Sequence, residues 1–295
     1  MKTLLLTFCS CLLIIGLTSC SDEKQTNVGQ KKPETTVKVD TFRNVIVLID
    51  LSSRVNLPYQ DAKDRAILKQ LVEVFQNSQR KYGFQISKDK LDVKIAFQQG
   101  AVTQPFEFGD DLTIDMTAPQ MNKPNFDVKK SKFIDAVDKL YNQAVKSKTT
   151  GADIWNFFNS HISNYIKKPD KKYVYKNKVI ILTDGYLEFD RSISSPRQKG
   201  TYFDPRYRLL RNKPNWSELF DSYNIKLKPC GTFENTEVLM LEVVPYNAIQ
   251  YSNEFQILEK IWLSWFKDMK INATLRLSED NSENLKYVLN SFLEK

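Results

Sequence analysis

The chain has 295 residues, of which 41% are hydrophobic, and this is enough apolar material for a substantial folded core. It contains one histidine, His161, which excludes a histidine-rich zinc site, and its excess of Lys and Arg gives a net charge of +8. After the first twenty residues, no apolar segment is long enough to span a bilayer.

The N-terminal segment has the pattern of an export signal. Lys2 supplies a positive charge, and the nearly continuous apolar run from Leu4 to Leu17 is too short for a stable membrane-spanning helix. The residues that follow, Leu17-Thr18-Ser19-Cys20, resemble the lipobox of bacterial lipoproteins. The resemblance implies that residues 1–19 are a signal peptide, that Cys20 is acylated, for example with palmitate, and that this lipid holds the protein on a membrane.

The lipoprotein resemblance also fixes what the remaining cysteines can do. Cys9 and Cys11 would leave with the signal peptide, so Cys230 would have no partner for an internal disulfide and no cysteine cluster for a metal. Residues 20–40 are polar and predict a flexible tether. Ser21-Asp22-Glu23 resembles the acidic tract of surface-exposed lipoproteins, although a solvated tether explains it equally well. We expect a location in the bacterial cell envelope, on the outer rather than the inner membrane.

From residue 41 to residue 295, strand and helix patterns alternate. Short apolar or alternating runs predict strands at Val45–Ile49, Val93–Phe97, Leu112–Met116, Val179–Leu182, Val238–Val244 and Ala273–Leu277. Apolar residues at helical spacing predict helices near residues 61–78, 133–144, 154–165, 257–266 and 285–292. The alternation predicts one α/β domain over residues 41–295. It would contain a doubly wound, mostly parallel six-stranded sheet with helices on both faces and one antiparallel edge strand.

Polar residues gather where the predicted strands end. The first strand leads into Asp50 and Ser52, the fourth leads into Asp184, and Thr150 and Asp153 open a helix between them. In sheets of this class, ligands bind beyond the carboxyl ends of the strands. Because these side chains offer only carboxylate and hydroxyl oxygens, they predict a site for Mg²⁺ or Mn²⁺.

The same residues resemble the metal-ion-dependent adhesion site of the von Willebrand factor type A domain, whose first strand is followed by the pattern D-x-S-x-S. Asp50, Ser52 and Asp184 match the first Asp, the first Ser and the last Asp of that site. Arg54 stands where the second Ser belongs. The family threonine becomes alanine when the loop is aligned on its glycine, so Thr150 or Asp153 would have to supply that oxygen. The alternative is a degenerate site in which Arg54 replaces the metal through a salt bridge to Asp50 or Asp184.

A basic insertion occupies roughly residues 190–215. Between Arg191 and Lys213 it carries seven basic residues and one acidic residue, a net charge of +6, whereas the chain without residues 1–19 has a net charge of +7. Arg197, Arg206, Arg208 and Arg211 are the candidate contacts to an acidic protein or polysaccharide. A solvated loop whose aromatic residues pack on the domain is the equally weighted alternative. Nucleic acid is not expected as a partner of an exported lipoprotein.

Two classes of function follow from this sequence. The first is a membrane-anchored binding or adhesion module, not an enzyme, that engages a protein or an envelope polymer through the strand-end site. The alternative is a metal-dependent hydrolase of the cell envelope. Against the hydrolase, the sequence contains no G-x-S-x-G motif and no second cluster of metal ligands.

Overall fold

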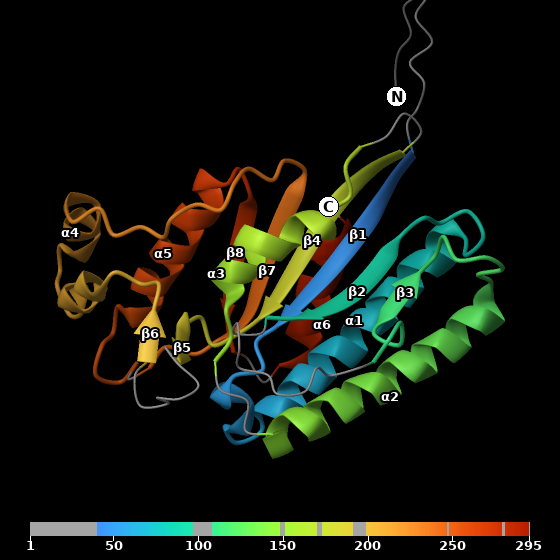
Figure 1. The fold of residues 1–295 in the computed structure, drawn as a ribbon, viewed down its shortest axis with the longest axis horizontal. Helices are drawn as coiled ribbons and strands as arrows, with labels where there is room; N and C mark the ends of the chain where they lie inside the picture. Colours follow the sequence, from blue (N-terminus) through green and yellow to red (C-terminus); the bar gives the residue numbers. More distant parts are fainter. Residues whose placement is uncertain are drawn as a thin grey trace, which may run out of the picture. The chain divides into compact units, whose positions relative to one another are not determined.

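The apolar runs form a six-stranded mixed sheet in the computed structural model of the protein (Figure 1). The structure describes residues 40–96, 108–147, 151–169, 173–190, 199–246, 248–278 and 281–294. Cys20 and the N-terminal tether lie outside the described residues. In the described part of the chain, no helix combines the length and apolar character needed to cross a bilayer.

The order of the strands in the sheet is β3-β2-β1-β4-β7-β8. The bounds are β1 Asp40–Ile49, β2 Lys90–Ile95, β3 Thr113–Asp115, β4 Tyr173–Leu182, β7 Thr236–Val243 and β8 Asn272–Leu277. β3 is the antiparallel edge strand, and the other neighbouring pairs are parallel. The mixed six-stranded sheet with one antiparallel edge strand is therefore confirmed.

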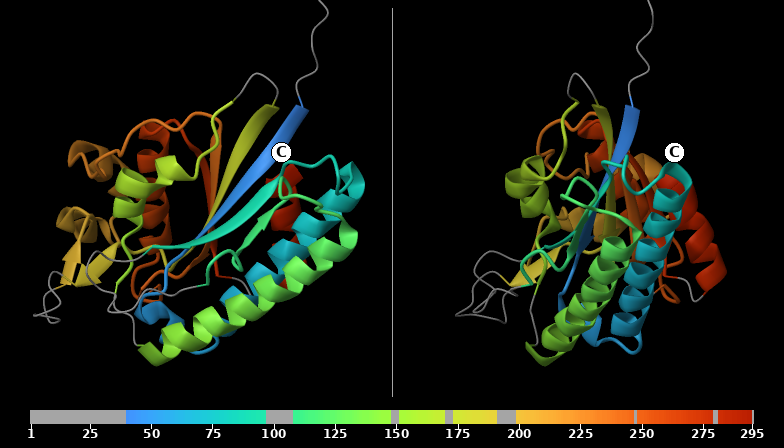
Figure 2. Two further views of the ribbon diagram at one scale, coloured as in Figure 1. Left: turned by 45° about the vertical axis from the view of Figure 1, so that its right-hand side comes forward. Right: turned by 90° about the vertical axis from the view of Figure 1, so that its right-hand side faces the viewer.

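Helices cover both faces of the sheet, as the edge-on view in Figure 2 shows. One face carries α1 Gln60–Tyr82, α2 Lys123–Ser147 and α6 Ser282–Glu294, and the other carries α3 Ile154–Asn156 and α5 Glu254–Asp268. β1 shows why both faces are needed. Val45, Val47 and Ile49 pack into the core on the α1 side, whereas Ile46 and Leu48 pack into the core on the α5 side. A strand that is apolar on both sides must be buried on both sides.

The segment after α3 departs from the expected single helix. A π-helical turn, η2, covers Phe157–His161, and a 3₁₀ turn, η3, covers Ile162–Asn164. The apolar residues Ile154, Phe158 and Ile162 recur every four residues, which is wider than the 3.6 residues of an α-helical turn. A wider π turn between them keeps all three in the core on the α5 side.

The basic insertion and the residues that flank it contain elements that the sequence patterns do not predict. The strands β5 Glu188–Asp190 and β6 Lys199–Thr201 pair as a separate two-stranded sheet, followed by the 3₁₀ helix η4 Pro205–Leu210 and the helix α4 Trp216–Ser222. The three-residue strands are too short for an alternating pattern to be recognised.

The order of the strands brings the carboxyl ends of β1 and β4 next to each other. After β1 the chain moves outward to β2 and β3, and it then returns to add β4 on the other side of β1. The carboxyl ends of β1 and β4 therefore meet where the strand order reverses, the usual ligand position in such sheets. A 3₁₀ turn, η1 Ser53–Asn56, continues the chain from the end of β1.

Candidate functional site

Asp50 is fixed between the ends of β1 and β4. Its backbone N–H donates to the carbonyl of Leu182 at 2.9 Å, which carries the β1–β4 ladder one residue beyond the strand. One oxygen of its buried carboxylate accepts the N–H of Ser52 at 2.8 Å, and the other accepts the hydroxyl of Thr183 at 2.8 Å. The residue before Asp184 thus positions the carboxylate of Asp50.

Asp184 follows β4 and is buried beside Asp50. Its carboxylate accepts the N–H of Tyr186 at 3.0 Å and the hydroxyl of Tyr246 at 2.7 Å. Burial, and then the charge of Asp50, raise the pKa of Asp184 to about 6. The hydroxyl of Thr183, the residue directly before Asp184, donates to the carboxylate of Asp50, so the two aspartates lie at the same edge of the sheet, where β1 and β4 end side by side.

Gly185 allows the chain to turn directly after Asp184. Its φ is +93°, a region that strains other residues, and a Cβ there would approach a side-chain carbon of Val243 at 3.0 Å. A larger residue would therefore displace the backbone that carries Asp184.

Arg54 corrects the sequence-based alternative. Its buried guanidinium forms a two-pronged ion pair with Asp64 of α1, at 2.7 and 3.1 Å, and not with Asp50 or Asp184. Asp64 is fully buried on the core face of α1, and burial raises its pKa to about 6 although Arg54 opposes the shift. A planar guanidinium selects the carboxylate that can accept both prongs. The carboxylates of Asp50 and Asp184 form no ion pair with any described residue.

The Arg54–Asp64 pair belongs to a buried polar network that connects several elements. The carboxylate of Asp64 also accepts the hydroxyl of Tyr141 in α2 at 2.9 Å and the side-chain amide of Gln60 at 3.0 Å. Gln60 donates in addition to Glu242 of β7, at 3.1 Å. The network ties η1, α1, α2 and β7 together directly behind the strand-end carboxylates. These hydrogen bonds hold the elements in one arrangement, although the buried Nε of Arg54 has no hydrogen-bond partner among the described residues.

Of the remaining predicted ligands, the structure describes only Asp153, whose carboxylate is engaged elsewhere. Thr150 lies outside the described residues. Asp153 caps α3, and its two oxygens accept the N–H of Asn156 at 2.7 Å and the hydroxyl of Tyr202 at 2.9 Å. In the described part of the chain, no three His, Cys, Asp or Glu side chains are grouped so that they could hold a metal ion. Among the described residues, the candidate donors are therefore the carboxylates of Asp50 and Asp184 with the hydroxyl of Ser52.

An aromatic pair beside Asp184 has no signal in the sequence. The rings of Tyr186 and Tyr246 stack with their centroids 3.9 Å apart and their planes 2° from parallel. The hydroxyl of Tyr186 donates to Glu254 at 2.9 Å, and Tyr246 is 41% exposed while its hydroxyl reaches Asp184. Tyr246 thus connects the buried carboxylate to the protein surface. These two residues follow different strands, so only the sheet order brings them together.

The candidate contact residues of the basic insertion differ in exposure and in ion pairing. Arg191 and Arg197 lie outside the described residues, and Arg206 and Arg208 are exposed. Arg211 is not a surface residue as expected: it forms a two-pronged ion pair, both distances 2.6 Å, with the fully buried Glu254.

The aromatic residues of the insertion contact the domain in two ways. Phe203 and Tyr207 are buried in the core on the α5 side, as the packing alternative predicts. The hydroxyl of Tyr202 is occupied by Asp153. The part of the insertion between residues 202 and 211 is therefore anchored on the domain, with Arg206 and Arg208 on its outer surface.

Comparison with known proteins gives only distant structural likenesses. No protein-family model matches the chain, and no curated protein matches it. The pilus adhesin SpaC from Lactobacillus rhamnosus GG is 10% identical with a TM-score of 0.41, covering 88% of this chain and 31% of that one. Proximal thread matrix protein 1 from the mussel byssus is 13% identical with a TM-score of 0.38, covering 86% of this chain and 48% of that one. The chain thus spans less than half of either structure, and likenesses this distant carry no functional argument.

Proposed function

We propose that this protein is a membrane-anchored binding module with the architecture of a von Willebrand factor type A domain. Its partner, a protein or an envelope polymer, engages the carboxyl edge of the sheet. The observation that supports the proposal is that Asp50 and Asp184 follow neighbouring strands where the strand order reverses, joined through the hydrogen bond of Thr183 to Asp50. The N-terminal lipid on Cys20 would hold the module on the outer membrane.

We further propose that the site takes Mg²⁺ or Mn²⁺. The donor chemistry fits, because Asp50, Asp184 and the hydroxyl of Ser52 offer the hard oxygen ligands that these ions prefer. The charge also fits, because the guanidinium of Arg54 pairs with Asp64 and the two strand-end carboxylates have no ion pair in the described part of the chain. Arg54 acts on Asp184 only through its charge, which opposes the rise in the pKa of Asp184 that burial causes. A bound ion would supply an open coordination position for an acidic group of the partner.

A thermal melt with added metal tests this proposal. An ion that binds only the folded state raises stability by RT ln(1 + [L]/Kd), about 2.7 kcal/mol at a hundredfold excess over Kd. We expect millimolar Mg²⁺ or Mn²⁺ to raise the melting temperature of the wild type and not that of Asp184→Asn. Asp153→Asn is the matched control and should keep the response, because Asp153 caps α3 and contacts Tyr202 of the insertion, and it shares no hydrogen-bond partner with Asp50 or Asp184. A folded wild type that shows no metal response contradicts the ion site.

The basic surface of the insertion supports an acidic partner. Arg206 and Arg208 are exposed on the anchored part of the insertion, which follows the strand that delivers Asp184, and Arg206 shares its charge with Asp204 in a two-pronged ion pair. Positive charge beside a binding edge attracts an acidic protein or polysaccharide over a distance of about one Debye length. We propose binding rather than turnover as the outcome. Loss of a hydrolytic activity in Asp50→Ala would instead favour the envelope hydrolase.

A further inference from the structure

A separate pocket of about 590 Å³ lies against β2, on the side of β1 away from β4. It forms because the edge strand is short: β3 pairs with Lys90, Leu91 and Asp92, and its last contact to β2 is the N–H of Val93 donating to Leu112. Beyond that point the outer edge of β2 is not covered by β3. The volume is in the range of small-molecule sites, about 300–1,000 Å³.

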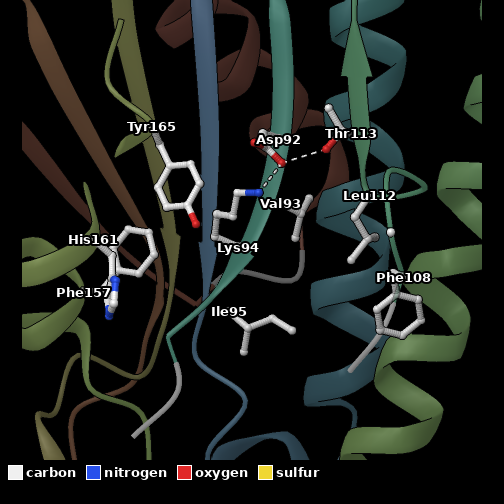
Figure 3. A pocket seen from close by; sticks show the side chains of 11 residues that line it. Asp92, Val93, Lys94, Ile95, Phe108, Leu112, Thr113, Phe157, His161 and Tyr165 are labelled. Carbon is white, nitrogen blue, oxygen red and sulfur yellow. Dashed lines mark hydrogen bonds and ion pairs between the residues drawn. The ribbon is translucent and has the colours of Figure 1, made fainter. Parts of the chain in front are cut away.

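Two different walls face each other across this pocket (Figure 3). On one side, Phe157, His161 and Tyr165 project at four-residue spacing from the segment containing η2 and η3. The rings of Phe157 and Tyr165 are stacked, with centroids 5.8 Å apart. On the other side lie Phe108 and Leu112, so a wall of rings faces a wall with apolar side chains.

Between these walls, β2 carries the charged side chains of Asp92 and Lys94. The carboxylate of Asp92 is buried and accepts the hydroxyl of Thr113 at 2.9 Å, while Lys94 lies 2.9 Å and Lys90 3.6 Å from it. One carboxylate is thus shared by two ammonium groups, which leaves an excess positive charge at the strand. Lys94 lines the pocket, whereas Lys90 is not among the residues that line it.

The ammonium of Lys94 is held in place and still has N–H donors that can bind a ligand. Its ammonium lies 4.6 Å from the centroid of the Tyr165 ring, a cation–π contact that fixes it between Asp92 and the aromatic wall. An ammonium has three N–H donors, and Asp92 accounts for one of them. A ligand that offers an anionic oxygen here would gain a charge-assisted hydrogen bond while its apolar part contacts the two walls.

We propose that this pocket binds a small amphipathic anion, with an acidic group on Lys94 and an apolar body between the wall of Phe157 and Tyr165 and the wall of Phe108 and Leu112. The site is independent of the strand-end carboxylates. The ligand class follows from the ammonium of Lys94, which lies between the two walls and shares its only carboxylate partner, Asp92, with Lys90 among the described residues. The acidic group could belong to a free carboxylic acid or to a lipid, which share this chemistry.

Two fluorescent probes test the proposal by separating the charge from the apolar contact. 8-Anilino-1-naphthalenesulfonate is an amphipathic anion, and N-phenyl-1-naphthylamine is the same fused-ring amine without the sulfonate. Both are titrated into the full-length protein carrying Cys20→Ser, so that no acyl chain competes for the dye. Every variant keeps the same N-terminal segment, so its contribution to fluorescence is common to all of them.

The expected pattern is different for each substitution. Lys94→Gln should weaken binding of the sulfonate about tenfold, the effect of losing one charge-assisted hydrogen bond, and leave the neutral probe unchanged. Lys94→Arg should retain most of the affinity. Lys90→Gln is the matched control, since Lys90 shares Asp92 and has nearly the same side-chain exposure, 25% against 26% for Lys94. Phe108→Ala should weaken both probes.

Several results would overturn the proposal. It fails if the folded wild type does not bind the sulfonate, if Lys94→Gln binds it as tightly as the wild type, or if Lys90→Gln causes the same loss. An unchanged affinity of both probes in Phe108→Ala would place them elsewhere on the protein. Competition by octanoate and by vesicles of anionic lipid then distinguishes a free acid from a lipid as the source of the acidic group.

Discussion

At the scale of single residues, the ion pair of Arg54 with Asp64 leaves the carboxylates of Asp50 and Asp184 without an ion pair among the described residues. Asp50 and Asp184 follow continuous apolar runs, so their position at the sheet edge can be predicted. The partner of Arg54 cannot be predicted from the D-x-S-x-S pattern, but a weaker signal exists. Asp64 lies three, four and seven residues before Ile67, Leu68 and Leu71, on the same buried face of α1. A carboxylate on a core face needs a buried partner.

A double-mutant cycle on Arg54 and Asp64 tests that pairing. Arg54→Met should lower the free energy of unfolding by about 3–5 kcal/mol, because it leaves the buried charge of Asp64 without its counterion. Adding Asp64→Leu to Arg54→Met should recover much of the loss, since both charges are then gone. Urea unfolding measures both values. The cycle of Arg54→Met with Asp50→Asn is the control, and a coupling as large as that with Asp64 would contradict the assigned pairing.

The raised pKa of Asp184 predicts a pH dependence. A folded-state pKa of about 6, above the usual value near 4, means that the folded protein binds more protons than the unfolded chain in this interval. The free energy of unfolding therefore falls as pH rises from about 4 to 6. Relative to Asp184→Asn, the wild type should lose up to about 3 kcal/mol over that window in metal-free buffer. Urea unfolding of both proteins at pH 4, 5, 6 and 7 measures the difference, and parallel pH curves would contradict it.

At the scale of elements, periodicity predicts the regular helices and strands and fails where the chain depends on tertiary contacts. α1, α2 and α5 have long apolar stripes that require one buried face each, so their existence follows from the sequence. The short strands β5 and β6 and the helix η4 have no such stripe. η4 and the residues before it are held by contacts with distant parts of the chain: Tyr207 and Leu210 are buried in the core on the α5 side, and Phe203 packs against Trp262.

The contact between the insertion and α5 gives a prediction at this scale. Arg211 is the counterion of Glu254, which is buried in the first turn of α5. Arg211→Met should destabilise the protein by about 3 kcal/mol, because a buried carboxylate loses its ion pair although Tyr186 still donates to it. Arg208→Met, at an exposed position of the same insertion, should change stability by less than about 0.5 kcal/mol. Equal unfolding midpoints for the two variants would show that the Arg211–Glu254 pair does not hold the insertion.

At the scale of the whole molecule, the membrane anchor and the binding edge are separate parts of one proposal. Lipid burial contributes about 0.8 kcal/mol per CH₂ group, and more than one acyl chain is needed for stable anchoring. Cys20→Ser should therefore move the protein from the membrane fraction to the soluble fraction of cells. Fractionation in high salt measures this without electrostatic adsorption. A mutant that remains with the membranes as completely as the wild type contradicts the lipid anchor.

The distribution of charge over the molecule gives a further prediction. If the insertion attracts acidic polymers locally, the position of a positive charge matters and not only the net charge of the protein. We expect Arg206→Gln with Arg208→Gln to elute from immobilised dextran sulfate at clearly lower salt than the wild type, because fewer positive charges then hold the polymer. Salt weakens this attraction, since the Debye length falls from about 10 Å at 0.1 M to about 3 Å at 1 M. Lys132→Gln with Lys286→Gln is the matched control.

The control removes the same amount of charge from exposed positions on α2 and α6. Folding should be nearly unaffected in both double variants, since all four side chains are exposed, and a thermal melt verifies this. A local binding surface requires that the arginine pair lowers the eluting salt concentration more than the lysine pair does. If both pairs lower it equally, retention depends on the net charge of the whole molecule, and the insertion has no particular affinity for acidic polymers. The comparison therefore separates recognition at the sheet edge from general attraction of a basic protein to a polyanion.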